Sequence, residues 1–148
     1  MNDPITGDTT EAARIHAQIA RHIYGEKRKQ KICVVSGGET TVRVVGRGKG
    51  GRNTEFALAL AIGIDGMKGI SCASIGTDGT DGATDVAGAR ATSMTVVEAK
   101  SRGIDPVEYL RRNDSYSFFE LAGGLVRTGP TETNVCDIHI VFMEPYET

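Results

Sequence analysis

The chain has 148 residues, a length typical of one domain, and hydrophobic residues make up 39% of it, which is enough for a sizeable core. Its formal net charge of −2 gives no overall field that would attract nucleic acid or an anionic membrane, so we expect neither as a partner. No apolar run approaches the ~20 residues that cross a bilayer, and the N-terminus lacks a signal-peptide pattern. We therefore expect a cytoplasmic protein.

The first half of the chain alternates between helical and extended patterns. Residues 9–24 predict a helix, because apolar side chains recur there at steps of three and four. The β-branched runs 32–36 and 40–45 are joined by "GGET", which predicts a hairpin. Residues 53–64 return to a helical pattern, and residues 70–76 form an apolar run that predicts a strand.

The second half continues the alternation. Residues 92–103 predict a helix, Pro106 suits the first turn of another, and residues 115–122 predict a third. Residues 123–134 read as a loop around a short extended piece, and 135–143 predict a closing strand, in which Val135, Ile138, Ile140 and Phe142 alternate with polar partners. We expect a single α/β domain over residues 1–148, with helices flanking a sheet that the hairpin makes mixed.

A cationic glycine loop lies between the expected hairpin and the helix that follows. Gly46, Gly48 and Gly51 fit the G-x-G-x-x-G pattern of dinucleotide-binding proteins. A hairpin before the loop is atypical of that fold, in which the fingerprint strand enters a βαβ unit. Free amides, Lys49 and Arg52 and the start of a helix favour an anion cradle instead. A flexible basic loop is the alternative.

An aspartate loop follows the expected strand at 70–76. In "GTDGTDGATDVAGA", Asp78, Asp81 and Asp85 stand among glycines, with a spacing unlike that of an EF-hand. Such carboxylates can hold Mg²⁺, hydrogen-bond a polyol or accept a hydroxyl proton. Aspartate also forms turns and caps helices, so a structural role is an alternative for each of them.

A third polar loop lies near the C-terminus. "LVRTGPTETNV" contains a guanidinium, three hydroxyls and an amide, from Arg127, Thr128, Thr131, Thr133 and Asn134. These groups suit phosphate or carboxylate oxygens, although turn chemistry alone could account for them. Together the three loops contain the parts that phosphoryl transfer needs, which are positioning groups, cations and a means of binding metal.

Five segments, "SGGETTV", "GRGKGGRNTEFALA", "GTDGTDGATDVAGA", "NDSYSFF" and "GLVRTGPTETNV", resemble the C-terminal domain of the class II glycerate 2-kinase family. This domain is called MOFRL, and older records labelled its members hydroxypyruvate reductases. The resemblance runs from about residue 6 to the end of the chain. It implies an ADP-forming kinase that uses ATP and Mg²⁺ to phosphorylate the 2-hydroxyl of D-glycerate. It also implies an active site in the cleft between this domain and an N-terminal Rossmann-like domain.

By this resemblance, Arg52 is the leading catalytic candidate, as a charge stabiliser for the phosphoryl group or the glycerate carboxylate. Asp78 and Asp81 are candidates for catalysis and for metal binding, and Glu39 is a further polar candidate. The remaining candidates for substrate or phosphate binding are Ser36, Gly37, Gly38, Gly48, Lys49, Gly50, Gly51, Asn53, Thr77, Asp85, Arg127, Thr128 and Thr131.

Two residues depart from the family pattern: Glu132 stands where the family commonly has Gly, and Cys136 where it commonly has Asn. The sequence also contains no counterpart of the N-terminal domain or of a lysine in it that the family needs, so we expect the chain to be inactive alone.

Two other hypotheses stay open. One is a fragment of an NAD(P)H-dependent hydroxypyruvate reductase, with Asp78 as the ribose partner. The other is a non-enzymatic domain that binds an anion or a partner, or that self-associates as a homo-oligomer through an exposed apolar patch.

Overall fold

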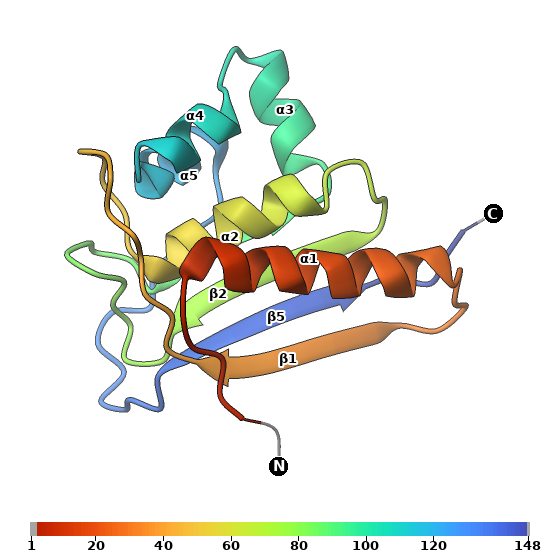
Figure 1. Ribbon diagram of the computed structural model, residues 1–148, viewed down its shortest axis with the longest axis horizontal. Coiled ribbons are helices and arrows are strands. Elements are labelled where there is room, and N and C mark those ends of the chain that lie inside the picture. The colour runs from red at the N-terminus through yellow and green to blue at the C-terminus, as the bar shows by residue number, and fades with distance from the viewer. Residues whose placement is uncertain (1–2, 148) are drawn as a thin grey trace.

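The computed structural model describes residues 3–147 and consists of a five-stranded sheet with helices packed on one face (Figure 1). The helices are α1 (Thr9–Gly25), α2 (Arg52–Gly63), α3 (Thr95–Ser101), α4 (Pro106–Arg111) and α5 (Ser115–Ala122). The strands are β1 (Ile32–Gly38), β2 (Ile70–Gly76), β3 (Gly88–Thr92), β4 (Leu125–Val126) and β5 (Asp137–Met143). No helix in this part of the chain is long and apolar enough to cross a membrane.

The sheet has the order β1-β5-β2-β3-β4, so the last strand of the chain lies between β1 and β2. The α/β class predicted from the alternation is confirmed. All four strand ladders are antiparallel, whereas we expected a mixed sheet. Parallel pairing among the described residues is limited to two isolated bridges, Ile5 with Gly38 and Asp8 with Thr41.

The predicted hairpin at 32–45 is wrong. Residues 40–45 form no strand, apart from the single bridge at Thr41, and Val44 and Val45 are exposed. β1 pairs instead with β5, about a hundred residues further along the chain, from Ile32 opposite Met143 to Gly38 opposite Asp137. A β-branched run becomes a strand only where it has a neighbour to pair with and a face to bury, and β5 takes the place that 40–45 would have filled.

The remaining elements follow the predictions closely, with one strand missed. α1, α2, α4 and α5 lie where the helical patterns were, and Asp105 caps α4 just before its first-turn proline. The helix expected from residue 92 begins only at Thr95, because residues 88–92 belong to β3. "GARAT" contains small residues and no alternating apolar pattern, so it gives no strand signal of its own.

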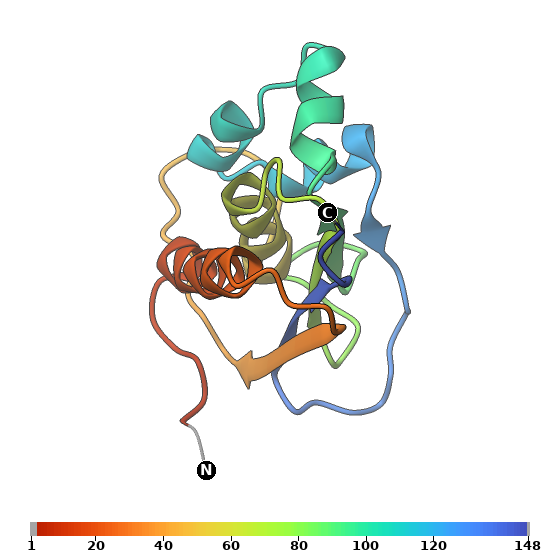
Figure 2. The same cartoon turned by 90° about the vertical axis from the view of Figure 1, so that its right-hand side faces the viewer.

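The core lies between the sheet and the helices. α2 is buried along nearly its whole length, with Phe56, Leu58 and Leu60 inaccessible, and α1 packs beside it (Figure 2). β5 turns Val141 and Met143 toward the helices. The alternating Ile138, Ile140 and Phe142 share a face, and this is the half-exposed face of the sheet away from α1 and α2.

Three long loops meet at one end of the sheet, where β1 and β2 end and β5 begins. They are residues 39–51, 77–87 and 127–136, seen at the left of Figure 1. Antiparallel pairing of β5 with both neighbours causes this convergence, since it places the start of β5 beside the ends of β1 and β2. These are the three loops that the sequence marked as polar.

Candidate functional site

Arg52 is the first residue of α2 and lies at the end of the sheet where the three polar loops meet. Its Nε and Nη2 donate to the two oxygens of Asp137, at 2.5 and 3.1 Å, and its Nη1 lies 3.3 Å from a carboxylate oxygen of Glu39. The hydrogen bonds that Arg52 donates to Asp137 raise the pKa of Arg52. Asp137 pairs across the sheet with Gly38 and Gly76, the last residues of β1 and β2.

The three members of this charged group differ in exposure. The Asp137 side chain is 0% exposed, that of Arg52 34% and that of Glu39 61%. The bidentate pair with Asp137 therefore orients the guanidinium, while the contact with Glu39 is open to solvent and can be replaced by another anion. The sequence analysis did not select Asp137. Its only signal was a carboxylate placed at the start of an otherwise apolar strand.

Asp81 is built into the fold rather than exposed on the loop. It is 1% exposed, and its two oxygens accept the backbone N–H groups of Asn53 at 2.7 Å and Thr54 at 2.9 Å. It thus caps the N-terminus of α2, and burial raises its pKa. This is the structural role that the sequence analysis held as its alternative, and it leaves neither oxygen open toward the loops.

Asp78 is half-buried in a tight turn of the same loop. One of its oxygens accepts from the N–H and the hydroxyl of Thr80, both at 3.0 Å. These hydrogen bonds lower the pKa of Asp78, and the charge of Arg52 adds to the effect. Its second oxygen has no hydrogen bond within residues 3–147. Among those same residues no three His, Cys, Asp or Glu side chains converge on one point, so they form no complete metal site.

The cationic glycine loop does not form the open amide cradle that we expected. Asn113 Oδ1 accepts the N–H groups of Val45 and Gly46, both at 2.8 Å. The N–H of Gly48 donates to the Arg112 carbonyl at 3.0 Å, and that of Lys49 donates to Asp114 Oδ1 at 2.9 Å. With Asp81 on the helix N-terminus as well, these backbone donors, which could have bound an anion, are satisfied inside the protein.

The glycines of the candidate list serve close packing. A Cβ at Gly46 or Gly48 would collide with the backbone that joins α4 to α5, and one at Gly51 with Asp81. At Gly50 the nearest atom would be the Ser115 hydroxyl, and at Gly38 the backbone of Ile5. Gly37 accepts the Ile5 N–H through its carbonyl, which ties the N-terminal segment to the end of β1. The pattern G-x-G-x-x-G is therefore explained here by contacts between backbones.

A second charged group joins all three loops to α5. Tyr116, 3% exposed, donates its hydroxyl to Asp85 at 2.8 Å, and Arg127 donates to the same hydroxyl at 3.2 Å. Arg127 Nε also lies 3.4 Å from Asp85, and Lys49 Nζ lies 3.8 Å from the centre of the Tyr116 ring. The hydrogen bond from Tyr116 lowers the pKa of Asp85. The sequence analysis selected Lys49, Asp85 and Arg127 but not the tyrosine that joins them.

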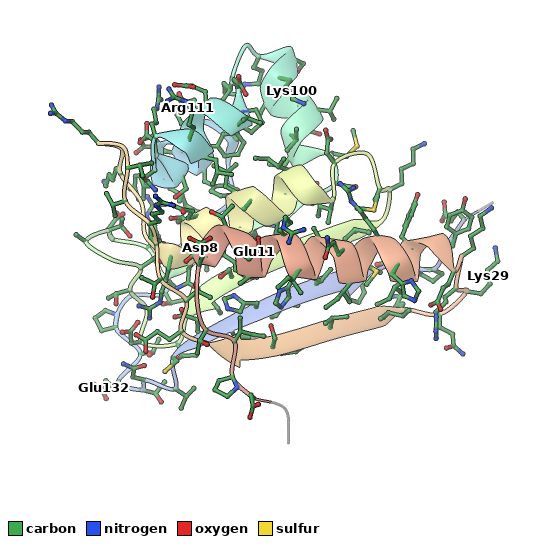
Figure 3. The ribbon with its side chains drawn as sticks, viewed as in Figure 1. Asp8, Glu11, Lys29, Lys100, Arg111 and Glu132 are labelled. Carbon is green, nitrogen blue, oxygen red and sulfur yellow. The ribbon has the colours of Figure 1, made fainter. Side chains whose placement is uncertain are left out.

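Two threonine hydroxyls, one from each loop, connect the C-terminal loop to the aspartate loop. The Thr77 hydroxyl donates to the Cys136 carbonyl at 2.7 Å, and the Thr131 hydroxyl donates to the Thr77 carbonyl. The Thr128 hydroxyl donates to the carbonyl of Gly129. Glu132 lies at the outer edge of this region (Figure 3). Glu132 and Cys136 have φ angles of 59° and 67°, which glycine and asparagine adopt more readily than other residues.

A polar row, buried at His139 and Ser74 and half-buried at Ser36, lies one step inside the charged group of Arg52. Ser36, His139 and Ser74 are neighbours across β1, β5 and β2. The Ser74 hydroxyl donates to Asn53 at 2.8 Å and lies 2.9 Å from His139 Nδ1. Asn53 Nδ2 and His139 Nε2 are buried without a partner among the described residues. Burial lowers the pKa of His139 to about 4, so its ring is neutral at pH 7. Ser36 and Asn53 thus point into the fold rather than toward the loops.

The comparison with family models identifies this arrangement. Residues 32–137, from β1 to the first residue of β5, match the MOFRL family. The chain belongs to the MOFRL family. This MOFRL domain is 44% identical over 135 residues to D-glycerate 2-kinase of Thermotoga maritima, a match that covers 90% of the chain and 32% of the relative. It is 41% identical over 147 residues to a protein of Agrobacterium vitis that carries a hydroxypyruvate reductase name, with 97% and 38% covered.

The fold is shared with a solved structure. The crystal structure of glycerate kinase from Thermotoga maritima superposes with a TM-score of 0.91 at 42% identity, covering 95% of this MOFRL domain and 34% of that chain. The chain thus spans about a third of the length of the relatives named here.

Proposed function

We propose that this MOFRL domain forms one wall of the active site of an ATP-dependent glycerate 2-kinase, which phosphorylates the 2-hydroxyl of D-glycerate. The observation that carries the proposal is Arg52, a partly exposed guanidinium that the buried Asp137 holds in place where three polar loops meet. The names and the fold of the relatives support the same reaction. The other wall would come from an N-terminal Rossmann-like domain, and we place the enzyme in the cytoplasm.

The reaction needs stabilisation of negative charge at a defined point. The glycerate 2-hydroxyl oxygen forms a bond to the γ-phosphorus of ATP as the bond to the leaving ADP oxygen breaks. Arg52 can bind the transferred phosphoryl group or the glycerate carboxylate. The bound anion would replace the solvent-exposed carboxylate of Glu39 beside the guanidinium. The pair with Asp137 orients the guanidinium in advance, which lowers the cost of binding.

We propose Mg²⁺ as a cofactor of the intact enzyme, not as an ion that this domain binds by itself. Asp81 uses both oxygens on the N-terminus of α2, and within residues 3–147 Asp78 is the remaining candidate ligand. One carboxylate oxygen is too little for an ion that prefers octahedral oxygen coordination. We therefore derive no step through Mg²⁺ here, and we assign any further ligands to the other domain and the nucleotide phosphates.

The reductase hypothesis finds less support in the geometry. Its dinucleotide fingerprint requires a parallel βαβ unit and an open helix N-terminus for the pyrophosphate. Here the ladders are antiparallel, the residues before the glycine loop form no strand, and Asp81 occupies the N-terminus of α2. A non-enzymatic anion-binding or self-associating domain is compatible with the exposed Val35 and Val135 near Glu39, but it leaves the Arg52 arrangement without a role.

The test has two parts. In the first, the chain is titrated in separate runs with ATP, D-glycerate and NADH, and backbone amides are followed by NMR. We expect ATP or glycerate to shift residues 46–52 and 77–85, whereas shifts with NADH alone would favour the reductase. In the second, the residue that aligns with Arg52 in the intact Thermotoga maritima kinase is changed to alanine, and the residue aligned with Arg111 is changed in the same way as the control. We expect turnover to fall at least tenfold in the first variant only, and unchanged turnover would refute the role of Arg52.

A further inference from the structure

The second charged group, formed by Lys49, Tyr116, Asp85 and Arg127, carries more positive than negative charge. Lys49 forms no ion pair with a carboxylate within the described chain, and its ammonium contacts only an aromatic face. Arg127 faces Asp85 at 3.4 Å, a long and exposed contact. The group therefore has two cations and one carboxylate, and of the two cations that carboxylate contacts only Arg127. Both contacts are open to solvent, so an anion can bind without displacing buried structure.

The group around Arg52 has the opposite balance. Its single guanidinium faces two carboxylates, of which Asp137 is buried and cannot move away. A polyanion placed there would meet this fixed negative charge, whereas a singly charged group could replace Glu39 alone. The charge balance therefore predicts that a polyanion binds at Lys49 and Arg127, and that a singly charged anion binds at Arg52.

Tyr116 holds the two cations on a rigid support. Its backbone N–H donates to the Lys49 carbonyl at 2.9 Å, its ring lies under the Lys49 ammonium, and its hydroxyl accepts from Arg127. The tyrosine is itself buried in α5, so it connects cations from two separate loops to the body of the domain. Such preorganisation reduces the side-chain entropy that binding would otherwise cost.

We propose that Lys49 and Arg127, supported by Tyr116, bind the phosphate tail of a nucleoside triphosphate, which leaves Arg52 for the glycerate carboxylate. This assignment rests on the kinase proposed above, and it gives its two anionic ligands separate places on this domain. Asp85 limits the net positive charge of the subsite, and its ion pair with Arg127 breaks when phosphate binds.

The probe is inorganic triphosphate without metal, added to the whole chain at low ionic strength and followed by NMR and calorimetry. We expect shifts at Lys49, Tyr116 and Arg127. We expect Lys49→Ala and Arg127→Ala each to weaken binding about tenfold or more, since hydrogen bonds to charged groups are worth ~1.5–3 kcal/mol. Lys100→Ala removes an equally exposed cation on α3, away from the loops (Figure 3), and serves as the matched control with unchanged affinity.

Three outcomes would overturn the assignment: no binding of triphosphate at millimolar concentration, shifts confined to Arg52 and Asp78, or a Lys49→Ala/Arg127→Ala double variant with the affinity of the parent. Both residues are exposed, so the variants should fold, and their melting curves check this. The kinase assay on Arg52 is separate. If triphosphate does not bind at Lys49 and Arg127 but the Arg52 variant of the kinase loses turnover, only this assignment fails. If triphosphate binds there but the Arg52 variant keeps its turnover, the proposed role of Arg52 fails.

Discussion

Replacing Asp81 with alanine separates a structural carboxylate from a metal ligand. The change leaves the N–H groups of Asn53 and Thr54 buried without an acceptor at the start of the most deeply buried helix of the domain. An unsatisfied buried donor costs ~1–3 kcal/mol and loss of a helix cap ~0.5–2 kcal/mol. The two costs are not added, because the cap consists of the same two hydrogen bonds. Removing a carboxylate whose pKa burial raises returns part of this cost. We expect Asp81→Ala to lower the free energy of unfolding by about 2–4 kcal/mol.

The assay is urea and thermal unfolding of the chain, with and without Mg²⁺. For a domain of this size the loss corresponds to a melting temperature lower by about 5–15 °C. Asp78→Asn is the matched control on the same loop, and it should lower the melting temperature far less, because the Asp78 side chain is partly exposed and forms hydrogen bonds only within its own turn. Neither result should depend on Mg²⁺ if Asp81 is a cap.

Two results would refute this reasoning. If Asp81→Ala unfolds at the same urea concentration as the parent, then the two hydrogen bonds do not hold the N-terminus of α2. If Mg²⁺ stabilises the parent but not the Asp81→Ala variant, then Asp81 is a metal ligand, as the sequence suggested.

Further predictions concern the groups near Arg52 and the C-terminal loop. Arg52→Ala leaves the buried Asp137 without its partner and should lower the free energy of unfolding by about 2–3 kcal/mol. This is less than the loss expected for a fully buried pair, because the guanidinium is partly exposed. The Arg52→Ala/Asp137→Ala variant should recover part of that loss in urea melts. His139 has a pKa of about 4 in the fold and 6.5 in its ordinary state, so the unfolded chain binds more protons. Stability should therefore fall as pH drops from 6.5 to 4, by up to ~1.4 kcal/mol per unit, and His139→Gln should remove this slope. Glu132→Gly and Cys136→Asn relieve positive φ angles and should each raise the free energy of unfolding by about 0.5–1 kcal/mol.

Each of these has a contrary result. Equal losses in the single and double Arg52 variants would mean that Asp137 is solvated without its partner. The His139 slope is read as the difference between parent and His139→Gln, because the buried Glu55 and Asp81, whose pKa values are raised, titrate in both proteins. A constant difference from pH 7 to 4 would contradict a neutral buried His139. Destabilisation by Glu132→Gly would show that its backbone is not strained.

The local pattern of the chain predicted most helices well. α1, α2 and α5 have apolar side chains at helical spacing, and α4 has its Asp-Pro start, so these stretches form helices wherever they pack. The failures were in the strands. The run at 40–45 has strand-forming residues but remains exposed coil, and β3 has few such residues but lies between β2 and β4. Strand formation depends on a neighbour, which a local pattern does not contain.

The sequence by itself determined the α/β class, the three polar loops and the family, because residue type and order carry that information. Only the tertiary structure decided what each group does. It placed Asp137 under Arg52 and Tyr116 under Lys49, since these residues come from segments distant in sequence that antiparallel pairing and helix packing bring together. It also turned Asp81 inward to cap α2 while Asp78, three residues away, remained at the loop surface. Burial and hydrogen-bond partners separate these two carboxylates, and neither can be read from a loop of aspartates and glycines.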